Sequence, residues 1–275
     1  MLTRFNWIHI VLMVLTVVLT IGCYYIFRNR TRKAKTIFMG SLIAFLLISW
    51  IIVFTLDMFL KPDIRAQWLL KLPLHMCGSN VVVFPIFFLV TTLRKKKPGL
   101  ITKSMYAYFF YVSSIGALLG LVMPSADVVD VVLLKDYYAI NYYLRHMIMF
   151  AIPIFWVCLG FYRPRFKHAI NAIVILLIFI TIAHGYNLLL SYLSVKTDPP
   201  EGYVVNFFYT RNTDNNIVLD LLWRIIPFEY FYLYSGIFVL VPIFTLYYIP
   251  CIFAYKYSWN LKDKYDLYRD GSIVR

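Results

Sequence analysis

Long apolar stretches alternate along the chain with short clusters of charged residues, and this pattern predicts an all-α protein. Apolar stretches of roughly 17–25 residues are long enough to cross a bilayer as helices. The pattern therefore predicts about seven transmembrane helices. They are expected over residues 7–27, 36–60, 72–93, 104–124, 140–162, 169–194 and 229–257. We interpret residues 1–275 as a single transmembrane helical domain, a polytopic membrane bundle that ends in a tail at 258–275.

Composition supports a membrane protein. The 275 residues are 61% hydrophobic and 15% charged, with a mean hydropathy of +0.72. Soluble domains carry roughly 45–50% apolar and about 25% charged residues. The net charge of +14 lies in clusters at the ends of apolar segments, not on a folded aqueous face, which excludes nucleic-acid binding. We expect membrane lipids as partners and a multi-pass location in the cell membrane, and the oligomeric state stays open.

The basic clusters also predict an orientation. Lys and Arg are concentrated after the first, third and fifth predicted spans. Cytoplasmic loops carry an excess of these residues. We therefore expect the N-terminus outside and the tail 258–275 in the cytoplasm. No small-residue cleavage site precedes the first basic cluster, so we interpret 7–27 as a retained span and not as a signal peptide.

One stretch, Leu72 to Asn80, concentrates groups that can do chemistry. It holds His75, Cys77 and Asn80 where a polar loop enters the third span. Polar side chains are costly inside lipid and usually have a partner or a task. The alternative is that His75 and Asn80 are hydrogen-bonded packing groups and Cys77 is a small hydrophobe. On a regular helix His75 and Cys77 point about 200° apart, so we give Cys77 the central role and His75 a supporting one.

Other spans are expected to deliver polar residues to the same outer half of the membrane. From the rise per residue of a helix, each lies within a few turns of the outer end. These residues are Asp57, Arg145, His146, His184, Asn187 and Glu229. In the sixth span Thr181, His184, Asn187 and Ser191 recur every three or four residues and should share one inward face.

A thiol beside histidines suits nucleophilic acyl transfer, in which a thiolate attacks an ester and a histidine moves the proton. Cys77 is the candidate nucleophile, and both His146 and His184 qualify as the base. Arg145 is expected to hold a phosphate head group or a carboxylate. Three histidines and a cysteine also have zinc-binding chemistry. Because no His pair has ligand spacing and the four cysteines are scattered, we predict no metal site, no cofactor and no disulfide framework.

Two other functions remain open. A lipid or small-solute transporter or flippase would keep Asp57 and His184 in the membrane as a proton-responsive pair. Against it stand the lack of an internal repeat and of paired broken helices. A non-catalytic receptor or scaffold would leave the Cys77 and His146 side chains too far apart to interact.

The polar motifs follow an order that resembles the YwaF-type integral membrane family, over roughly residues 70–235. The matching segments are Leu72-Pro73-Leu74-His75-Met76-Cys77, Gly116-Ala117-Leu118-Leu119 to Met123-Pro124, Arg145-His146, Tyr162-Arg163-Pro164, His184-Gly185-Tyr186-Asn187, and Leu219-Asp220 to Pro227-Phe228-Glu229-Tyr230. Leu-Pro-Leu-His-x-Cys is the strongest of them.

The resemblance implies an enzyme, because a related animal membrane protein is an acyltransferase that builds polyunsaturated ether phospholipids with a cysteine nucleophile and a histidine. It implies Cys77 as nucleophile and His146 as base. His75, Asn80, Arg145, His184, Asn187 and Asp57 would then surround the phospholipid substrate. Two departures occur: Gly185-Tyr186-Asn187-Leu188 replaces Gly-x-Asn-Tyr-x-Phe-Leu, and Phe228-Glu229 falls where the family has the second Trp of Pro-Trp-Pro-Trp.

Overall fold

In the computed structural model every regular element is a helix, and no strand occurs among the residues that the structure describes. Those residues are 5–60, 72–93, 99–124, 128, 131–196, 206–213 and 217–257. The predicted all-α fold class is confirmed. The predicted tail 258–275, the connector 61–71 and the basic run 94–97 lie outside the described residues.

Each predicted span corresponds to a helix, with ends that differ from the prediction by up to four residues. The helices are α1 (Trp7–Phe27), α2 (Arg32–Leu60), α4 (Met76–Leu93), the continuous run of α5 (Leu100–Tyr108), η2 (Phe109–Ser113) and α6 (Ser114–Val122), then α7 (Tyr137–Cys158), α8 (His168–Lys196) and α10 (Tyr232–Tyr257). Three shorter helices lie between them: η4 (Leu133–Lys135), η5 (Phe207–Tyr209) and α9 (Ile217–Ile225).

Six of the long helices are apolar enough to cross a membrane by length and composition, and α7 is the exception among the described residues. With 22 residues α7 is long enough, but its first half carries Asn141, Arg145 and His146. These polar side chains suit a helix surrounded by protein better than one surrounded by lipid. The orientation of the bundle in the membrane stays a prediction.

Local sequence explains where two helices differ from the predicted spans. Helix α4 begins at Met76 and not at Leu72, because a turn containing Pro73 precedes it and the His75 carbonyl accepts the first helical hydrogen bond, from Ser79 N at 2.7 Å. The helical angle between His75 and Cys77 therefore does not apply. Helix α7 ends at Cys158 because Gly160 adopts a left-handed φ of 82°.

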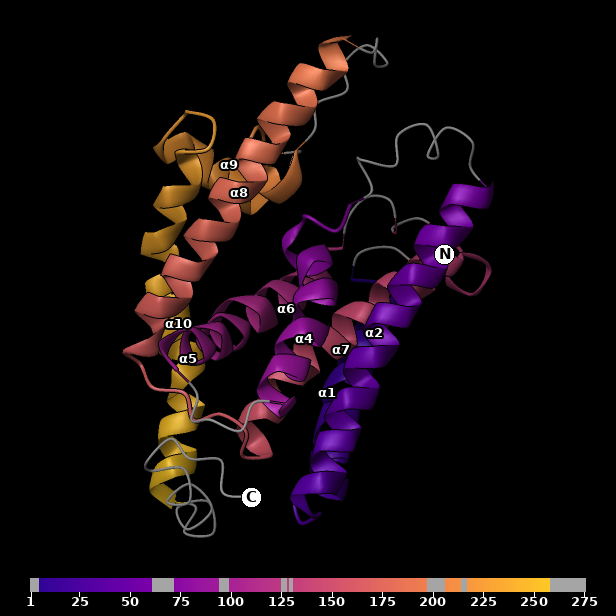
Figure 1. The fold of residues 1–275 in the computed structure, drawn as a ribbon, viewed down its shortest axis with the longest axis vertical. Coiled ribbons are helices and arrows are strands. Elements are labelled where there is room, and N and C mark those ends of the chain that lie inside the picture. The colour runs from indigo at the N-terminus through magenta and orange to yellow at the C-terminus, as the bar shows by residue number, and fades with distance from the viewer. Residues whose placement is uncertain are drawn as a thin grey trace.

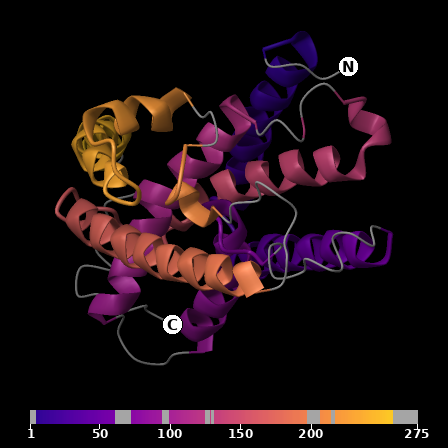
Figure 2. The same cartoon turned by 90° about the horizontal axis from the view of Figure 1, so that it is seen from above.

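The helices are arranged with α8, α9 and α10 on one side of the molecule and α1 and α2 on the other (Figure 1). Between them lie α4, α6 and α7, while α5 reaches the side of α8, as the view from above also shows (Figure 2).

The core lies where α4, α5–η2 and α7 meet, around the buried Trp156 of α7. Phe84 of α4 packs edge-on against its ring at 5.4 Å, and Phe109 lies at 5.2 Å. Tyr106 of α5 contacts the same ring at 5.4 Å. Such aromatic pairs hold three helices in a fixed relation around the middle of α4. Cys77 and Asn80 lie toward the N-terminal end of the same helix.

Candidate functional site

The first turn of α4 sets Cys77 against the middle of the bundle. The side chain of Met76, next to it, reaches α6: its methyl carbon lies 1.9 Å from where a Cβ on Gly116 would stand. A Cβ at this position would require the end of the methionine side chain to shift. Cys77 is partly buried and packs against the main core. The thiol therefore lies at the interface of α4 with the α5–η2–α6 run.

Arg145 of α7 is the cation that acts on this thiol. The two groups lie close enough to interact electrostatically. The Arg145 Nε is buried and has no hydrogen-bond partner, and Nη1 makes one long bond of 3.4 Å to Asn141 Oδ1. Within the described part of the chain, no carboxylate pairs with it. A half-buried guanidinium without such a carboxylate partner favours any negative charge that forms near it.

His146, the neighbour of Arg145, is held in one tautomer. Its Nδ1 lies 2.8 Å from the carbonyl oxygen of Tyr142, which can only accept, so Nδ1 carries the proton. In the neutral ring Nε2 then carries the lone pair, which is the form a general base needs. This ring lies against α6: Nε2 is 2.7 Å and Cδ2 is 2.5 Å from where a Cβ on Gly120 would stand.

Gly116 and Gly120 show how His146 lies relative to the start of α4. Met76 lies over Gly116 and His146 lies over Gly120, one helical turn or about 6 Å further along the same face of α6. No hydrogen bond joins His146 to Cys77 among the described residues. Met76, the neighbour of Cys77, and His146 thus contact one face of α6 at successive turns.

Asn80, also predicted from the sequence, points from α4 into the same region and is 1% exposed. Its Nδ2 donates to Ser113 Oγ at 2.8 Å, and its Oδ1 has no hydrogen-bond partner. Ser113 ends η2, a π-helical turn that separates α5 from α6. Single π turns are rare and often occur at functional sites.

Tyr108 is the residue that sequence reasoning missed. It ends α5, is fully buried, and interacts electrostatically with Cys77. Among the described residues its hydroxyl has no hydrogen-bond partner. The chain has 23 tyrosines, and nothing in the spacing distinguishes this one. No signal in the sequence alone would have selected it.

His75 lies outside the α4 helix, against a separate segment. Its ring contacts Phe207 at 5.2 Å and Tyr209 at 5.6 Å. Both belong to residues 206–212, which we call the 206–212 segment. The backbone there is unusual, because Phe208 and Tyr209 have φ values of 56° and 55°. Non-glycine residues adopt this conformation at a cost.

The polar face of α8 holds the 206–212 segment. Asn187 is fully buried: its Nδ2 donates to Phe207 O and to Thr210 Oγ1, both at 2.8 Å, and its Oδ1 accepts from Phe207 N at 3.0 Å. His184 Nδ1 lies 3.0 Å from the same Thr210 hydroxyl. Ser191 and Arg211 are joined at 3.2 Å. The side chains that the sequence placed on one face therefore bind one stretch of chain.

The same face continues toward α10. The Thr181 hydroxyl bonds to Tyr230 OH at 2.7 Å, and the Tyr230 ring stacks on His184 at 4.7 Å. Glu229 pairs with Arg211 at 2.8 Å. The two residues predicted to react as a proton-responsive pair have different partners, since Asp57 of α2 accepts a hydrogen bond of 2.8 Å from Tyr137.

A second buried histidine, which the sequence analysis did not select, ties α1 to the bundle. His9 is fully buried, its Nδ1 accepts from Phe5 N at 2.9 Å, and its Nε2 donates to Leu121 O at 2.6 Å. Both ring nitrogens are used within the chain. We therefore assign His9 a structural role.

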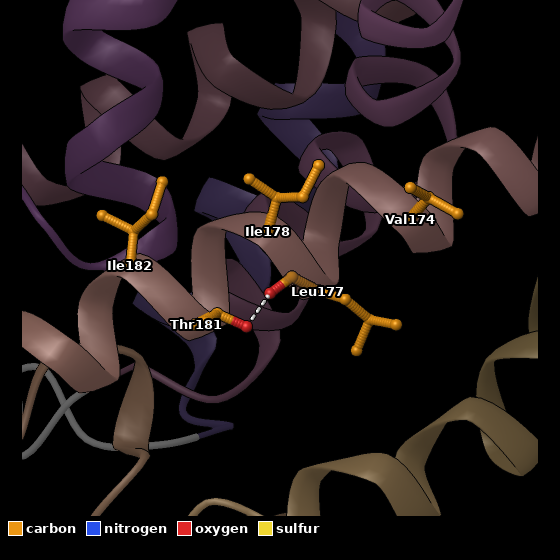
Figure 3. Close-up of a pocket in the computed structure, with 5 residues that line it drawn as sticks. All are labelled: Val174, Leu177, Ile178, Thr181 and Ile182. Carbon is orange, nitrogen blue, oxygen red and sulfur yellow. Dashed lines mark hydrogen bonds between the residues drawn. The ribbon is translucent and has the colours of Figure 1, made fainter.

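A shallow apolar groove of about 320 Å³ lies along α8, next to the polar face at Thr181 (Figure 3). It is lined by Val174, Leu177, Ile178, Thr181 and Ile182. No residue around Cys77 takes part. Within the described residues, no three His, Cys, Asp or Glu side chains lie close enough together to hold a metal ion.

Comparison with known proteins gives one match. The family model described as the TMEM164 family matches residues 2–248. This range includes all of residues 70–235, in which the motifs lie. No curated protein and no solved structure matches the chain.

Proposed function

The chain belongs to the TMEM164 family, and we propose that it is a membrane enzyme that transfers acyl chains between phospholipids through a thioester on Cys77. One observation supports the proposal above the others. The Cys77 thiol interacts electrostatically with the half-buried Arg145 guanidinium, for which no carboxylate partner occurs among the described residues. The cation favours the thiolate, which is the reactive form, and so opposes the apolar surround, which favours the neutral thiol.

The proton goes to His146. Its Nδ1–H bond to Tyr142 O keeps Nε2 free to accept a proton in the neutral ring. Because Cys77 and His146 are not hydrogen-bonded in the structure, transfer requires that they approach when substrate binds or that one water connects them. Catalytic hydrogen bonds are often long before substrate binds.

The reaction has two halves. In the first, the Cys77 proton passes to His146 Nε2, the sulfur bonds to the ester carbonyl carbon, and the ester C–O bond breaks. The leaving alkoxide of the lysolipid takes the proton from His146. In the second, His146 removes the proton from an acceptor hydroxyl, the hydroxyl oxygen bonds to the thioester carbonyl carbon, and the C–S bond breaks. The leaving Cys77 thiolate then takes the proton back from His146. Each difficult acyl transfer is thereby divided into two easier steps.

The other predicted residues take supporting parts. Asn80 faces the same region, with an amide oxygen able to accept a hydrogen bond from an acceptor hydroxyl. His184 and Asn187 hold the 206–212 segment, and this segment packs on His75 at the entrance to α4. Asp57 acts on α7 from a distance, through Tyr137. The apolar groove on α8 offers acyl chains a lipid-facing surface (Figure 3).

The test is acyl exchange in reconstituted vesicles. Purified protein is placed in phosphatidylcholine vesicles that contain lysophosphatidylethanolamine, and transfer of an isotope-labelled acyl chain is followed by mass spectrometry. Cys77→Ala is expected to abolish transfer and the hydroxylamine-sensitive acyl adduct on the protein. Cys158→Ala, which removes another partly buried thiol, is the matched control and should retain both.

Transfer at the wild-type rate by Cys77→Ala would refute the covalent mechanism. If lipid moves between leaflets with no acyl exchange, and Cys77→Ala makes no difference, a lipid transporter becomes the better description.

A further inference from the structure

We propose that α9 (Ile217–Ile225) lies in the head-group layer of one leaflet, with one apolar side immersed in lipid. The helix has nine residues and is about 13 Å long, so it cannot cross the ~30 Å hydrocarbon core of a bilayer. It lies across α10, which is seen end-on in Figure 2. The partner of this helix is then the lipid surface, whether or not the protein transfers acyl chains.

One side of α9 packs on α10. Leu222 is 7% exposed, and the Trp223 ring lies edge-on against Tyr232 at a centroid distance of 5.1 Å. Leu221 and Ile225, in contrast, are 58% and 61% exposed. Because these two residues lie four positions apart, both project from the same side of the helix. Helix α9 therefore presents one apolar side to the protein and a second apolar side to its surroundings.

The third side of α9 is charged. Asp220 and Arg224 are also four positions apart and so share it. Asp220 accepts a hydrogen bond from the Thr213 hydroxyl, and Arg224 is exposed. The apolar and charged sides together make α9 amphipathic. Such a helix lies in a membrane surface, with its apolar side chains in lipid and its charged side chains toward head groups and water.

The contacts of α9 with α10 set its level relative to the membrane. Leu222 Cδ1 lies 3.2 Å from where a Cβ on Gly236 would stand, and the Leu222 carbonyl accepts a hydrogen bond of 3.3 Å from Ser235 Oγ. Ser235 and Gly236 lie about 4–6 Å along α10 from its first residue, Tyr232. Because α10 is apolar enough to cross a membrane from Tyr232 onward, α9 lies just inside the end of a membrane-crossing helix. Amphipathic helices insert their apolar side at this depth, roughly 5–10 Å into the boundary between head groups and acyl chains.

The 206–212 segment places the start of α4 at the same level. Tyr232 OH, at the start of α10, donates to the carbonyl oxygens of Tyr209 and Asn212. The Tyr209 ring in turn contacts His75, the residue before α4, at 5.6 Å. Helix α4 is also apolar enough to cross a membrane, from Met76 onward. Two membrane-crossing helices thus begin at the level of α9, as expected at the boundary of a membrane.

Exposed aromatic residues follow α9 along the chain. Phe228 and Phe231 are both exposed, and Phe238 of α10 is 82% exposed. Since α10 has the length and composition of a membrane-crossing helix, Phe238 faces acyl chains. The exposed apolar surface thus leads from such a helix to Leu221 and Ile225, which favours lipid over water as what covers them.

The experiment places the photoreactive residue p-benzoylphenylalanine at Leu221, Ile225, Arg224 or Phe238, one position at a time, in the full chain. The protein is reconstituted in phosphatidylcholine vesicles and irradiated, and mass spectrometry identifies what has become attached to the side chain. Leu221 and Ile225 should give a lipid adduct in a yield similar to that at Phe238. Arg224, about 100° round the helix from Ile225, should give several-fold less.

All four side chains are exposed, so the replacement disturbs no buried packing, and an unchanged midpoint of unfolding in SDS checks this. Three results would overturn the proposal. Absence of a lipid adduct at Leu221 and Ile225, while Phe238 reacts, would show that they face water. Adducts between two chains would show that a second copy covers them, and an equal lipid yield at Arg224 would show lipid on every open side of α9. Acyl exchange is not measured, so the result stands whether Cys77→Ala is active or inactive.

Discussion

Replacement of Gly120 by alanine is the most direct test of the packing that positions His146. A Cβ at this position would lie 2.5 Å from His146 Cδ2 and 2.7 Å from Nε2. Non-bonded heavy atoms prefer about 3.5–4.0 Å, so the ring must retreat by about 1 Å. It is held on the other side by the bond from Nδ1 to Tyr142 O. The clash therefore falls on a side chain that has little freedom to move.

The expected cost follows from two opposing terms. Overpacking of this kind costs about 1–3 kcal/mol. Removing a glycine from a helix interior returns about 0.5–1 kcal/mol. Gly22→Ala in α1 is the matched control, because nothing lies within 4 Å of its added Cβ, and it should show the gain alone. The two variants should thus differ in free energy of unfolding by about 1–3 kcal/mol.

The assay is unfolding in mixed micelles with increasing SDS, followed by tryptophan fluorescence, together with acyl exchange in vesicles. A 1 Å displacement of a reacting group can lower a rate about 10²-fold. Gly120→Ala should therefore lose about that factor, and Gly22→Ala should lose none. If both variants gain stability equally, the His146 ring does not depend on the missing side chain of Gly120, and the reasoning is wrong.

Three further changes probe polar contacts, each by SDS unfolding. Asn187→Ala removes three hydrogen bonds to the 206–212 segment and should lower the free energy of unfolding by about 2–4 kcal/mol. A protease should then cleave that segment faster. Unchanged cleavage would contradict the conclusion that Asn187 holds the segment. His9→Leu should lower the free energy of unfolding by about 1–3 kcal/mol, because it leaves the buried carbonyl of Leu121 unpaired, and it should not change acyl exchange. A loss of activity at unchanged stability would show that the histidine is not structural. Tyr137→Phe should cost about 1–2 kcal/mol by removing a hydrogen bond to the Asp57 carboxylate, and no measurable loss would mean that this bond contributes little.

The sequence predicted the bundle and one polar face because both depend on spacing. Apolar length is visible along the chain, and α1 has the predicted bounds of 7–27. The three- and four-residue spacing of Thr181, His184 and Asn187 places them on one side of α8, and all three bond to the segments that cover it. The spacing does not predict which residues pack against that face. Its partners come from residues twenty or more positions away.

The surroundings of Cys77 were predictable only in part. Cysteine and arginine are conspicuous in an apolar run, so Cys77 and Arg145 could be selected from the sequence. Tyr108 could not, since tyrosine is common in this chain and what distinguishes Tyr108 is a buried hydroxyl with no partner among the described residues. The end of α7 was predicted four residues late, because apolar residues continue past the left-handed Gly160 that turns the chain.

The backbone of the 206–212 segment has a consequence for the order in which the protein assembles. Phe208, Tyr209 and Tyr230, three bulky aromatic residues, all adopt left-handed φ values between 55° and 63°. An isolated peptide would abandon that shape, because the left-handed conformation costs roughly 1–2 kcal/mol per residue for L-amino acids. The segment can acquire its shape only against a surface already built by α8 and the entrance to α4. We therefore expect the 206–212 segment to fold after α8 and the entrance to α4 during biogenesis. It should also be the first part to detach when α8 moves.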